Sequence, residues 1–464
     1  MAGLFQVFFW LSRDNLVTLN ENSFEKIESL SYSPFEGYDK NLLSSEQIAY
    51  DVNLFENFTN KLRTYGTLEA YKILQSSKDS NLPIDLGLWI GGDLQENNLE
   101  IQRALEILKE YPNRIQSVIV GNEVLLRKEL EPLELYAYID FMKSHTKKPV
   151  TTAETWDIWE KNPQLASHVD FLTIHILPYW EKVPIERYNE FIIEKYSVVE
   201  ELFPNRKIVI GETGWPSHGY NNNKAVPSIK NQAQAIRGFV NLAHEKGWHY
   251  NIIEALDQPW KGYDEGNVGQ YWGIFTTDRA LKFQLAGEVE LNKYWLYQMI
   301  AAIIIGALLT IFGLKNQRVN ISHAFAYAIA AQGMAFGIVM AAIYPFVNYM
   351  NFGMWIMWGM GSFLMIPLVI ITLAKANELF RSSIGVQPSR LVPLDLKSKN
   401  APLVSIHVPA YKEQPHVLAE TLESLSKLTY PNFEVLVIIN NTPEDFYKAP
   451  IKELCEKLGD KFKY

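Results

Sequence analysis

The sequence has a single cysteine, Cys455, among 464 residues. An intrachain disulfide needs two cysteines, so the chain cannot contain one, which fits a bacterial protein better than a disulfide-stapled secreted one. Acidic residues outnumber basic ones, 52 to 43, and the net charge is −9. A nucleic-acid surface needs concentrated positive charge, so nucleic acid is not an expected partner. No glycine-rich phosphate loop follows the first apolar run. The sequence therefore lacks a feature that is typical of one class of α/β fold, the doubly wound open sheet.

Composition divides the chain into three regions, of which the middle one, residues 295–374, is almost free of charge. We expect a first domain at 25–288, a membrane region at 293–376, a cytoplasmic linker at 377–400 and a last domain at 401–464. The apolar lead at 1–24 contains a run that is too short to cross a bilayer, and we expect it to be the remnant of a longer membrane helix. The last domain has too little chain to close, which indicates a fragment of a longer protein.

Eight apolar runs in the first region alternate with helical patterns or long loops. The runs are Ile27 to Tyr32, Lys61 to Tyr65, Ile84 to Ile90, Ile115 to Val120, Pro149 to Ala153, Val169 to Ile174, Lys207 to Ile210 and Asn251 to Leu256. Amphipathic stretches such as Glu100 to Glu110 and Asn231 to Lys246 lie between them. Strands that alternate with helices over about 260 residues predict an α/β fold, the (β/α)8 TIM barrel.

Two glutamates stand where predicted barrel strands end. Glu123 follows the fourth run and Glu212 closes the seventh. The chemistry of such barrels lies at the C-terminal strand ends, so the two carboxyls should face each other across one cleft. Retaining glycosidases use two carboxyls about 5–5.5 Å apart, one to protonate the leaving oxygen and one to attack the anomeric carbon. We assign Glu123 as acid/base and Glu212 as nucleophile; the alternative is two ordinary rim carboxylates in ion pairs.

Aromatic and polar residues near the ends of the apolar runs complete the predicted site. Flat rings stack on sugar faces while their polar edges hydrogen-bond, so a groove of this kind suits an oligosaccharide. Asn122 is a candidate partner for the sugar 2-hydroxyl, and His175 fits either a sugar contact or a satisfied core position. The predicted substrate-binding residues are Arg63, Asn122, Glu154, Trp156, His175, Tyr179, Trp215, Asp257, Trp260 and Lys261. No metal is expected here, because no metal-binding pattern of Cys, His and carboxylates occurs.

The segment Gly211-Glu212-Thr213-Gly214-Trp215-Pro216-Ser217, together with Gly121-Asn122-Glu123, strongly resembles glycoside hydrolase family 17. This family contains β-1,3-glucanases and related β-1,3-glucan transferases. The resemblance covers roughly residues 27–288 and implies a (β/α)8 barrel, retention of configuration and a β-glucan substrate, with Glu212 as nucleophile and Glu123 as acid/base. Plant members have an Asn-x-Tyr-Pro-Tyr-type segment where this chain has His175-Ile176-Leu177-Pro178-Tyr179-Trp180, which points to the bacterial membrane-linked branch.

Three successive segments are long and apolar enough to cross a bilayer: Trp295 to Leu314, His323 to Val347 and Phe352 to Ala374. Basic residues lie between the first two segments and after the third. They are Lys315, Arg318, Lys375, Arg381, Arg390, Lys397 and Lys399. By the positive-inside rule the tail is cytoplasmic and the barrel is periplasmic or otherwise extracytoplasmic. We expect a multi-pass protein of the bacterial inner membrane, with the lipid bilayer as a partner.

The tail reads as a strand, a helix and a second strand, at Val404 to Glu413, Val417 to Leu428 and Phe433 to Ile439. This start of a βαβ unit resembles the opening of family-2 glycosyltransferases of the cellulose-synthase kind, which have a Rossmann-like domain. Lys412 stands where that family usually has Asn, and Ile439-Asn440 where an acidic pair is common. The resemblance implies UDP-glucose and Mg²⁺ only for the complete transferase domain. No cofactor is expected for the barrel.

The order of these parts is similar to that of bacterial β-(1,3)/(1,6)-glucan synthases. It implies a membrane-bound protein of β-glucan synthesis and remodelling, whose barrel cleaves or transfers β-1,3-glucan. Water attacking the glucosyl-Glu212 intermediate would give hydrolysis, and a sugar hydroxyl would give transfer. Two alternatives are a non-catalytic β-glucan-binding module that guides the nascent chain and a scaffold in a glucan export complex.

Overall fold

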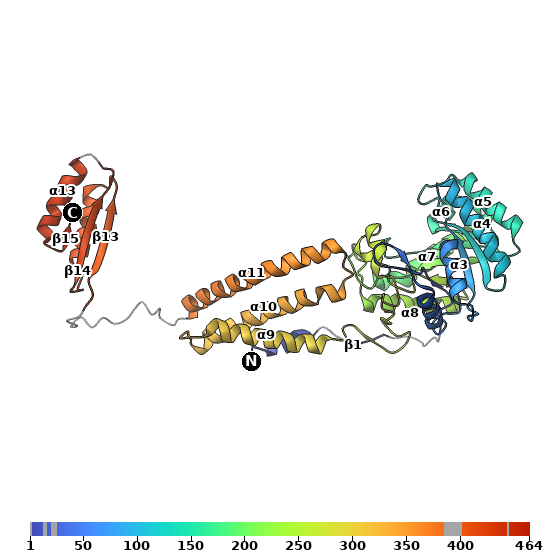
Figure 1. Cartoon of the computed structure of the whole chain (residues 1–464), viewed down its shortest axis with the longest axis horizontal. Helices are drawn as coiled ribbons and strands as arrows, with labels where there is room; N and C mark the ends of the chain where they lie inside the picture. The colour runs from blue at the N-terminus through green and yellow to red at the C-terminus, as the bar shows by residue number, and fades with distance from the viewer. Residues whose placement is uncertain (1, 13–15, 20–25, 385–400, 443–444) are drawn as a thin grey trace. The chain divides into compact units, whose positions relative to one another are not determined.

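The computed structural model describes residues 2–12, 16–19, 26–384, 401–442 and 445–464. These residues form two compact units, Met1–Ile384 and Gly385–Tyr464 (Figure 1). Most of the predicted linker, residues 385–400, lies outside the described residues, as do the basic residues Arg390, Lys397 and Lys399.

Eight parallel strands close into a barrel in the first unit, which confirms the predicted fold. In chain order they are β2 (Leu30–Ser31), β5 (Leu62–Arg63), β6 (Ile84–Leu88), β7 (Ile115–Asn122), β8 (Val150–Thr155), β9 (Leu172–His175), β10 (Ile208–Thr213) and β11 (His249–Ile252). The helices between them are α2 (Ser45–Phe55), α3 (Thr67–Ser76), α4 (Leu94–Glu110), α5 (Pro132–His145), α6 (Trp156–Lys161), α7 (Tyr188–Leu202) and α8 (Ile229–Lys246). Each strand falls in or overlaps one of the eight apolar runs.

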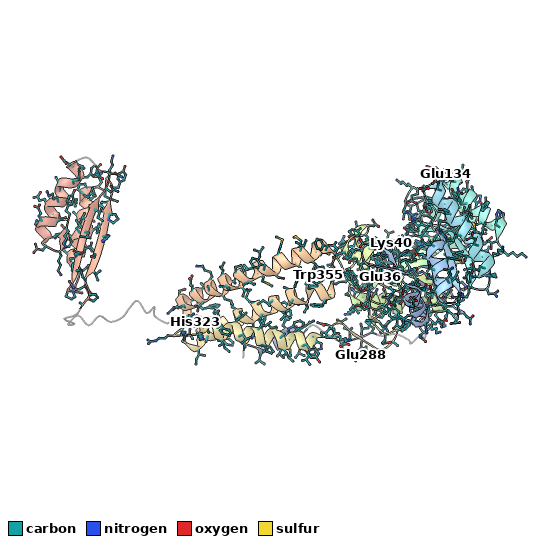
Figure 2. All side chains as sticks on the ribbon, viewed as in Figure 1. Glu36, Lys40, Glu134, Glu288, His323 and Trp355 are labelled. Atoms are coloured by element: carbon teal, nitrogen blue, oxygen red, sulfur yellow. The ribbon has the colours of Figure 1, made fainter. Side chains whose placement is uncertain are left out.

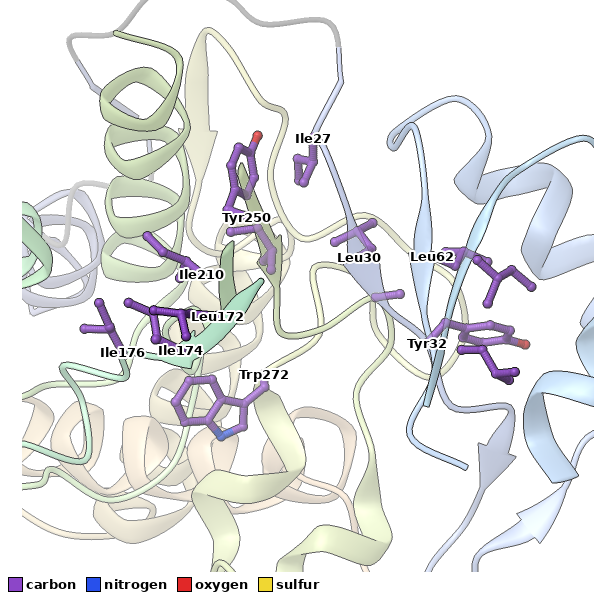
Figure 3. Packing of buried hydrophobic residues seen from close by; sticks show 14 of the residues in the cluster. Ile27, Leu30, Tyr32, Leu62, Leu172, Ile174, Ile176, Ile210, Tyr250 and Trp272 are labelled. Atoms are coloured by element: carbon purple, nitrogen blue, oxygen red, sulfur yellow. The ribbon is translucent and has the colours of Figure 1, made fainter. Parts of the chain in front are cut away.

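Side chains of the strands and the surrounding helices pack into one hydrophobic core. Leu30, Leu172 and Ile210 are fully buried within it (Figure 3). Each such aliphatic side chain contributes about 1.5–3 kcal/mol through removal from water. The helices begin at defined caps, because the side chains of Asp93 and Ser228 accept hydrogen bonds from the first-turn N–H groups of α4 and α8.

Strands β7 and β10 are irregular next to their glutamates. The register of β7 against β8 shifts between Ile119 and Asn122, and Glu123 itself has φ 56°. The register of β10 against β9 shifts between Ile210 and Glu212. Irregularities of this kind re-aim side chains and are common beside active sites. Glycine is required in β10, because a Cβ on Gly211 would lie 2.4 Å from the Thr173 side chain.

Short antiparallel pairs and 3-10 turns complete the barrel. The strands β1 (Leu16–Thr18) and β12 (Glu288–Glu290) pair with each other, and β3 (Phe35–Glu36) pairs with β4 (Asn41–Leu42). The turns are η1 (Pro163–Ser167), η2 (Ile185–Arg187), η3 (Pro259–Tyr263) and η4 (Asn267–Tyr271).

Three helices are long and apolar enough to cross a membrane: α9 (Trp295–Leu314), α10 (Ile321–Val347) and α11 (Phe352–Ile384). The last one extends beyond the predicted end at 374, and there Asn377 Oδ1 lies 2.8 Å from His323 Nε2 of α10. Figure 2 shows His323 at one end of the helices and Trp355 at the end near the barrel. The short helix α1 (Leu4–Leu11) packs against α9 and α10, and its buried Gln6 donates to the Gln332 carbonyl at 2.7 Å.

The segment between α10 and α11 contacts the barrel at loops that follow β2 and β11. The Tyr349 hydroxyl donates to Asp257 Oδ2 at 2.8 Å, and the Tyr349 N–H donates to the Tyr271 hydroxyl at 3.0 Å. The two tyrosine rings stack with centroids 5.1 Å apart. Tyr38 donates to the Tyr349 carbonyl at 2.7 Å. These loops leave the C-terminal strand ends, so the helical region contacts the barrel on the same end as Glu123 and Glu212.

The second unit contains β13 (Val404–Ala410), α12 (Pro415–Ser426), β14 (Phe433–Ile439), α13 (Asp445–Leu458) and β15 (Phe462–Lys463). The three strands form a parallel sheet, so the βαβ pattern predicted for this segment is present. The free Cys455 lies in its core beside Leu422 and Val435.

Asp257 forms a buried ion pair with Lys282 at 2.7 Å, with side-chain exposures of 1% and 5%. Breaking one side of such a pair leaves a buried charge without compensation and costs about 3–5 kcal/mol. We therefore expect Asp257→Asn to lower the Tm of the detergent-solubilised chain by on the order of 10 °C, followed by near-UV circular dichroism.

Lys161→Ala is the matched control, because it breaks an ion pair with Asp157 in which the lysine is 64% exposed. Exposed pairs contribute about 0–1 kcal/mol, so this Tm should move by no more than a few degrees. An Asp257→Asn protein as stable as the control would refute the structural role of the pair.

Candidate active site

Glu123 and Glu212 meet at the C-terminal end of the barrel. Glu123 directly follows β7, the fourth barrel strand, and its N–H donates to the Ala153 carbonyl of β8 at 2.7 Å. Glu212 lies in β10, the seventh strand, and is 5% exposed. One oxygen of each carboxylate and one nitrogen of His175 all lie within 4.8 Å of one another. This spacing matches the close carboxyl pair of a retaining glycosidase, about 5–5.5 Å, rather than the wider pair of an inverting enzyme.

His175, at the end of β9, connects the two acids. Its Nδ1 lies 2.8 Å from Glu123 Oε1 and its Nε2 lies 3.6 Å from Glu212 Oε1. Burial opposes ionisation of Glu123, but the hydrogen bond and charge of His175, with the charges of Arg127 and Arg63, hold its pKa below the ordinary value. A general acid needs the opposite shift. The predicted acid role of Glu123 therefore requires that substrate alter the contact with His175.

Arg63 lies beneath the pair and is 2% exposed. Its guanidinium donates to Asn122 Oδ1 at 2.6 Å and to the Gly211 carbonyl. It also lies 3.5 Å from Glu212 Oε1 and 3.3 Å from His175 Nε2. One side chain of β5 thereby connects the ends of β7, β9 and β10. Its planar fork of donors suits this role, which the single ammonium of a lysine would not fill.

Two pockets flank the glutamates. A cleft of about 530 Å³ has aromatic residues of the loops after β2, β5, β6 and β11 in its lining, among them Phe35, Tyr65, Trp89 and Trp260. A smaller pocket of about 230 Å³ is bordered by residues that include Trp156, His175, Trp180 and Trp272. Glu123 and Glu212 line both pockets, so the cleft and the smaller pocket meet at the two carboxylates.

Several predicted substrate-binding residues line these pockets. Asn122, Trp260 and Lys261 line the larger one, and Trp156 and His175 line the smaller one. The Lys261 ammonium binds the buried Glu254 carboxylate at 2.8 Å. Lys40 lies 4.3 Å from the Trp260 ring centre, a cation–π contact that holds this ring at the cleft.

Five predicted residues lie in neither lining: Arg63, Glu154, Tyr179, Trp215 and Asp257. Tyr179 and Trp215 are fully buried, and their polar atoms donate to the carbonyls of Tyr220 and Val226. Asp257 is held by Lys282 and Tyr349. Arg63 acts from beneath, as described above. The prediction relied on position after a strand, but loops that fold back over the barrel bury some of the residues at such positions.

Glu154, at the end of β8, also lies behind the site. It is fully buried and accepts hydrogen bonds from the N–H groups of Leu125, at 2.7 Å, and Leu126, in the turn after Glu123. Burial raises its pKa to about 7, although the two backbone hydrogen bonds oppose the shift. Glu154 therefore fixes the turn that carries Glu123 rather than lining the pockets.

Several residues that line the cleft were not predicted from the sequence. Tyr65 closes the second apolar run and Trp89 is the residue before the end of the third, so a search for aromatic residues near the ends of the runs, which found Trp156 and Trp260, would also have found them. Trp89 is 46% exposed, and the Arg127 guanidinium lies 4.5 Å from its ring centre. Arg127, Lys40 and Glu69 also line the cleft, but they lie on loops and a helix that the strand pattern does not mark.

Within the described residues, Glu123, His175 and Glu212 are also spaced so that they could hold a metal ion. The absence of a metal from the reaction remains a prediction. Two carboxyls at close spacing are also the pair that retaining glycosidases use, and that chemistry needs no metal.

Residues 29–273 match the BtgE/BtgC glycoside hydrolase domain family, and residues 405–464 match glycosyl transferase family 2. The first match covers the barrel strands and both glutamates. The second covers the strands and helices of the second unit.

Named relatives agree with the first match. The chain is 25% identical over 260 residues to the probable family 17 glucosidase SCW4 of Saccharomyces cerevisiae, covering 54% of this chain and 66% of that protein. It is 27% identical over 255 residues to a glucan 1,3-beta-glucosidase of Schizosaccharomyces pombe, covering 51% of this chain and 79% of that protein. The chain therefore spans slightly less than two thirds of SCW4.

The barrel also resembles a solved structure, the glycoside hydrolase family 17 beta-1,3-glucanosyltransferase from Rhizomucor miehei. The TM-score is 0.51 and the identity is 24%, covering 56% of this chain and 97% of that chain. At this identity the likeness supports the barrel fold.

The contact between His175 and Glu123 makes the pH dependence testable. Because His175 favours the ionised form of Glu123, His175→Ala should raise the pKa of Glu123. If Glu123 is the acid, the basic limb of the pH profile of kcat/KM on β-1,3-gluco-oligosaccharides then moves to higher pH.

His168→Ala is the matched control, because His168 pairs with Asp140 on the surface at 2.9 Å. Its pH profile should equal that of the wild type. A basic limb that stays in place or moves to lower pH in His175→Ala would show that this contact does not lower the pKa of the acid.

Proposed function

The chain belongs to the BtgE/BtgC glycoside hydrolase family, and we therefore propose that its barrel cleaves or transfers β-1,3-glucan with retention of configuration. The observation that carries this proposal is the spacing of Glu123 and Glu212 at the C-terminal strand ends, where one oxygen of each carboxylate lies within 4.8 Å of the other. The similarity to a glucan 1,3-beta-glucosidase and to a beta-1,3-glucanosyltransferase supports the substrate class.

In the first step of this mechanism, Glu212 attacks the anomeric carbon and Glu123 gives its proton to the leaving glycosidic oxygen. Glu212 Oε1 accepts no hydrogen bond from the described residues, so the lone pairs of this buried oxygen are not occupied by a donor. Arg63, 3.5 Å away, orients the carboxylate. In the second step Glu123 takes a proton from water or from a sugar hydroxyl, whose oxygen displaces Glu212 and restores the original configuration.

The aromatic lining supplies the sugar contacts. Trp89 and Trp260 on one side, and Trp156 and Trp180 on the other, present rings on which pyranose faces stack. The barrel uses no cofactor in this proposal, because the two carboxyls complete the acid/base and nucleophilic chemistry. UDP-glucose and Mg²⁺ would serve only the complete domain to which residues 405–464 belong.

We further propose that the three apolar helices anchor the chain in a bacterial inner membrane, with the barrel outside and the tail in the cytoplasm. Lys315 and Arg318 between α9 and α10, and Lys375 and Arg381 in α11, support this orientation. The contact of Tyr349 with Asp257 supports a link between barrel and membrane, because it joins the helices to the end of the barrel that carries the glutamates.

The match of residues 405–464 to glycosyl transferase family 2 supports a role in glucan synthesis. In the proposed arrangement a cytoplasmic transferase, complete only with further chain, extends a β-glucan across the membrane, and the barrel trims, branches or cyclises it outside. The proposed whole resembles the bacterial β-(1,3)/(1,6)-glucan synthases.

The full chain in detergent, given β-1,3-glucotetraose, should yield new oligosaccharides by mass spectrometry. Glu212→Gln should lower the rate by about 10³-fold or more, because the nucleophile is lost. The exposed Glu201→Gln, on α7, is the matched control and should retain full activity.

Products longer than the substrate indicate transfer, and only shorter products indicate hydrolysis. Wild-type activity in Glu212→Gln would refute the assignment of the nucleophile.

The orientation can be tested by cysteine labelling in a Cys455→Ser background. Lys161→Cys places a thiol on the barrel surface and Lys427→Cys places one on the surface of the second unit. A membrane-impermeant maleimide applied to intact spheroplasts should label position 161, and position 427 only after detergent. The reverse pattern, or equal labelling without detergent, would contradict the proposed orientation.

A further inference from the structure

A third carboxylate lies at the junction of the two pockets. The cleft of about 530 Å³ and the pocket of about 230 Å³ have four lining residues in common: Glu123, Glu212, Ile253 and Glu265. Two of these are the proposed catalytic acids and one is apolar. A residue that borders both pockets lies next to the bond that the acids would break.

The local chain is built around the Glu265 side chain. Glu265 follows the turn η3, and its N–H donates to the Lys261 carbonyl at 2.9 Å. A Cβ on Gly269 would lie 2.6 Å from the Glu265 Cβ and 2.9 Å from its Oε2. The absence of a side chain at 269 therefore gives Glu265 its space in the loop after β11.

The Glu265 carboxylate has no hydrogen-bond donor among the described residues. The nearest attractive charge is Lys261, whose ammonium already binds Glu254 at 2.8 Å. Burial raises the pKa of Glu265, Lys261 opposes this, and Glu212, Glu123 and Asp264 raise it further. The other charged residues that line the two pockets are Lys40, Glu69, Arg127 and Glu181. A partly buried carboxylate without a donor has an unmet need for hydrogen bonds.

Sugar hydroxyls are the donors that a glucan brings to this position. We propose that Glu265 is a substrate-binding residue that accepts hydrogen bonds from hydroxyls of the sugar units on both sides of the cleaved linkage. It holds the donor sugar for attack by Glu212 and the incoming sugar for deprotonation by Glu123. This inference rests on the proposed function of the barrel and adds a third acid to its site.

The test compares Glu265→Gln, Glu265→Ala and Glu265→Asp in the full chain with β-1,3-glucotetraose. Hydrogen bonds to a charged group contribute about 1.5–3 kcal/mol, so Glu265→Ala should lower kcat/KM by about tenfold or more. Glu265→Asp should recover part of this loss. The exposed Glu290→Gln, on β12, is the matched control and should match the wild type.

A pH profile separates a contact at the site from a loss of folding. The negative charge of Glu265 disfavours ionisation of Glu123, so its removal in Glu265→Gln should lower the pKa of Glu123 and move the basic limb of kcat/KM to lower pH. This direction is opposite to that expected for His175→Ala. A kcat/KM within twofold of wild type in Glu265→Ala, or a basic limb that does not move in Glu265→Gln, would overturn the proposal.

The Glu212 variant distinguishes a failure of the proposed mechanism from a failure of the role proposed for Glu265. If Glu212→Gln keeps wild-type activity, the mechanism itself is wrong. If Glu212→Gln is inactive while the Glu265 variants behave as wild type, the mechanism stands and only the role of Glu265 is overturned.

Discussion

The buried guanidinium of Arg63 is the interaction on which the arrangement of the site depends. It contacts Asn122, Gly211, His175 and Glu212, which belong to three other strands. A cation that is 2% exposed is stable only where such partners compensate its desolvation. The strands must therefore end at positions that bring these partners together, and the same positions bring one carboxylate oxygen each of Glu123 and Glu212 within 4.8 Å of each other.

The strand irregularities provide those positions. A regular strand would alternate its side chains between barrel interior and helix layer, and one residue of shift exchanges the two faces. The shifts in β7 and β10 instead direct both glutamates to the mouth of the barrel. Glu154 then fixes the turn after Glu123 through the N–H groups of Leu125 and Leu126. The buried charge of Arg63 and the irregular backbone of β7 and β10 thus together determine the positions of Glu123 and Glu212.

The barrel, its eight strands and the three apolar helices could be predicted because each leaves a continuous apolar run in the sequence. Glu123 and Glu212 could be predicted because each closes such a run. The burial of Tyr179, Trp215 and Asp257 could not be predicted, because it depends on which loop folds back to cover them. The contact of Tyr349 with Asp257 joins residues far apart in sequence. Glu265 carries no strand or motif signal, and only the shared pocket lining identifies it.

In the proposed mechanism Glu212 forms a covalent bond with the cleaved glucan. A 2-deoxy-2-fluoro-β-glucosyl donor with a good leaving group slows both chemical steps, but the second more than the first, so the intermediate accumulates. Mass spectrometry of the digested protein should then find one added sugar on the peptide that contains Glu212. A sugar on the peptide that contains Glu123, or a turnover of the donor that yields the inverted product without any labelled peptide, would contradict the account.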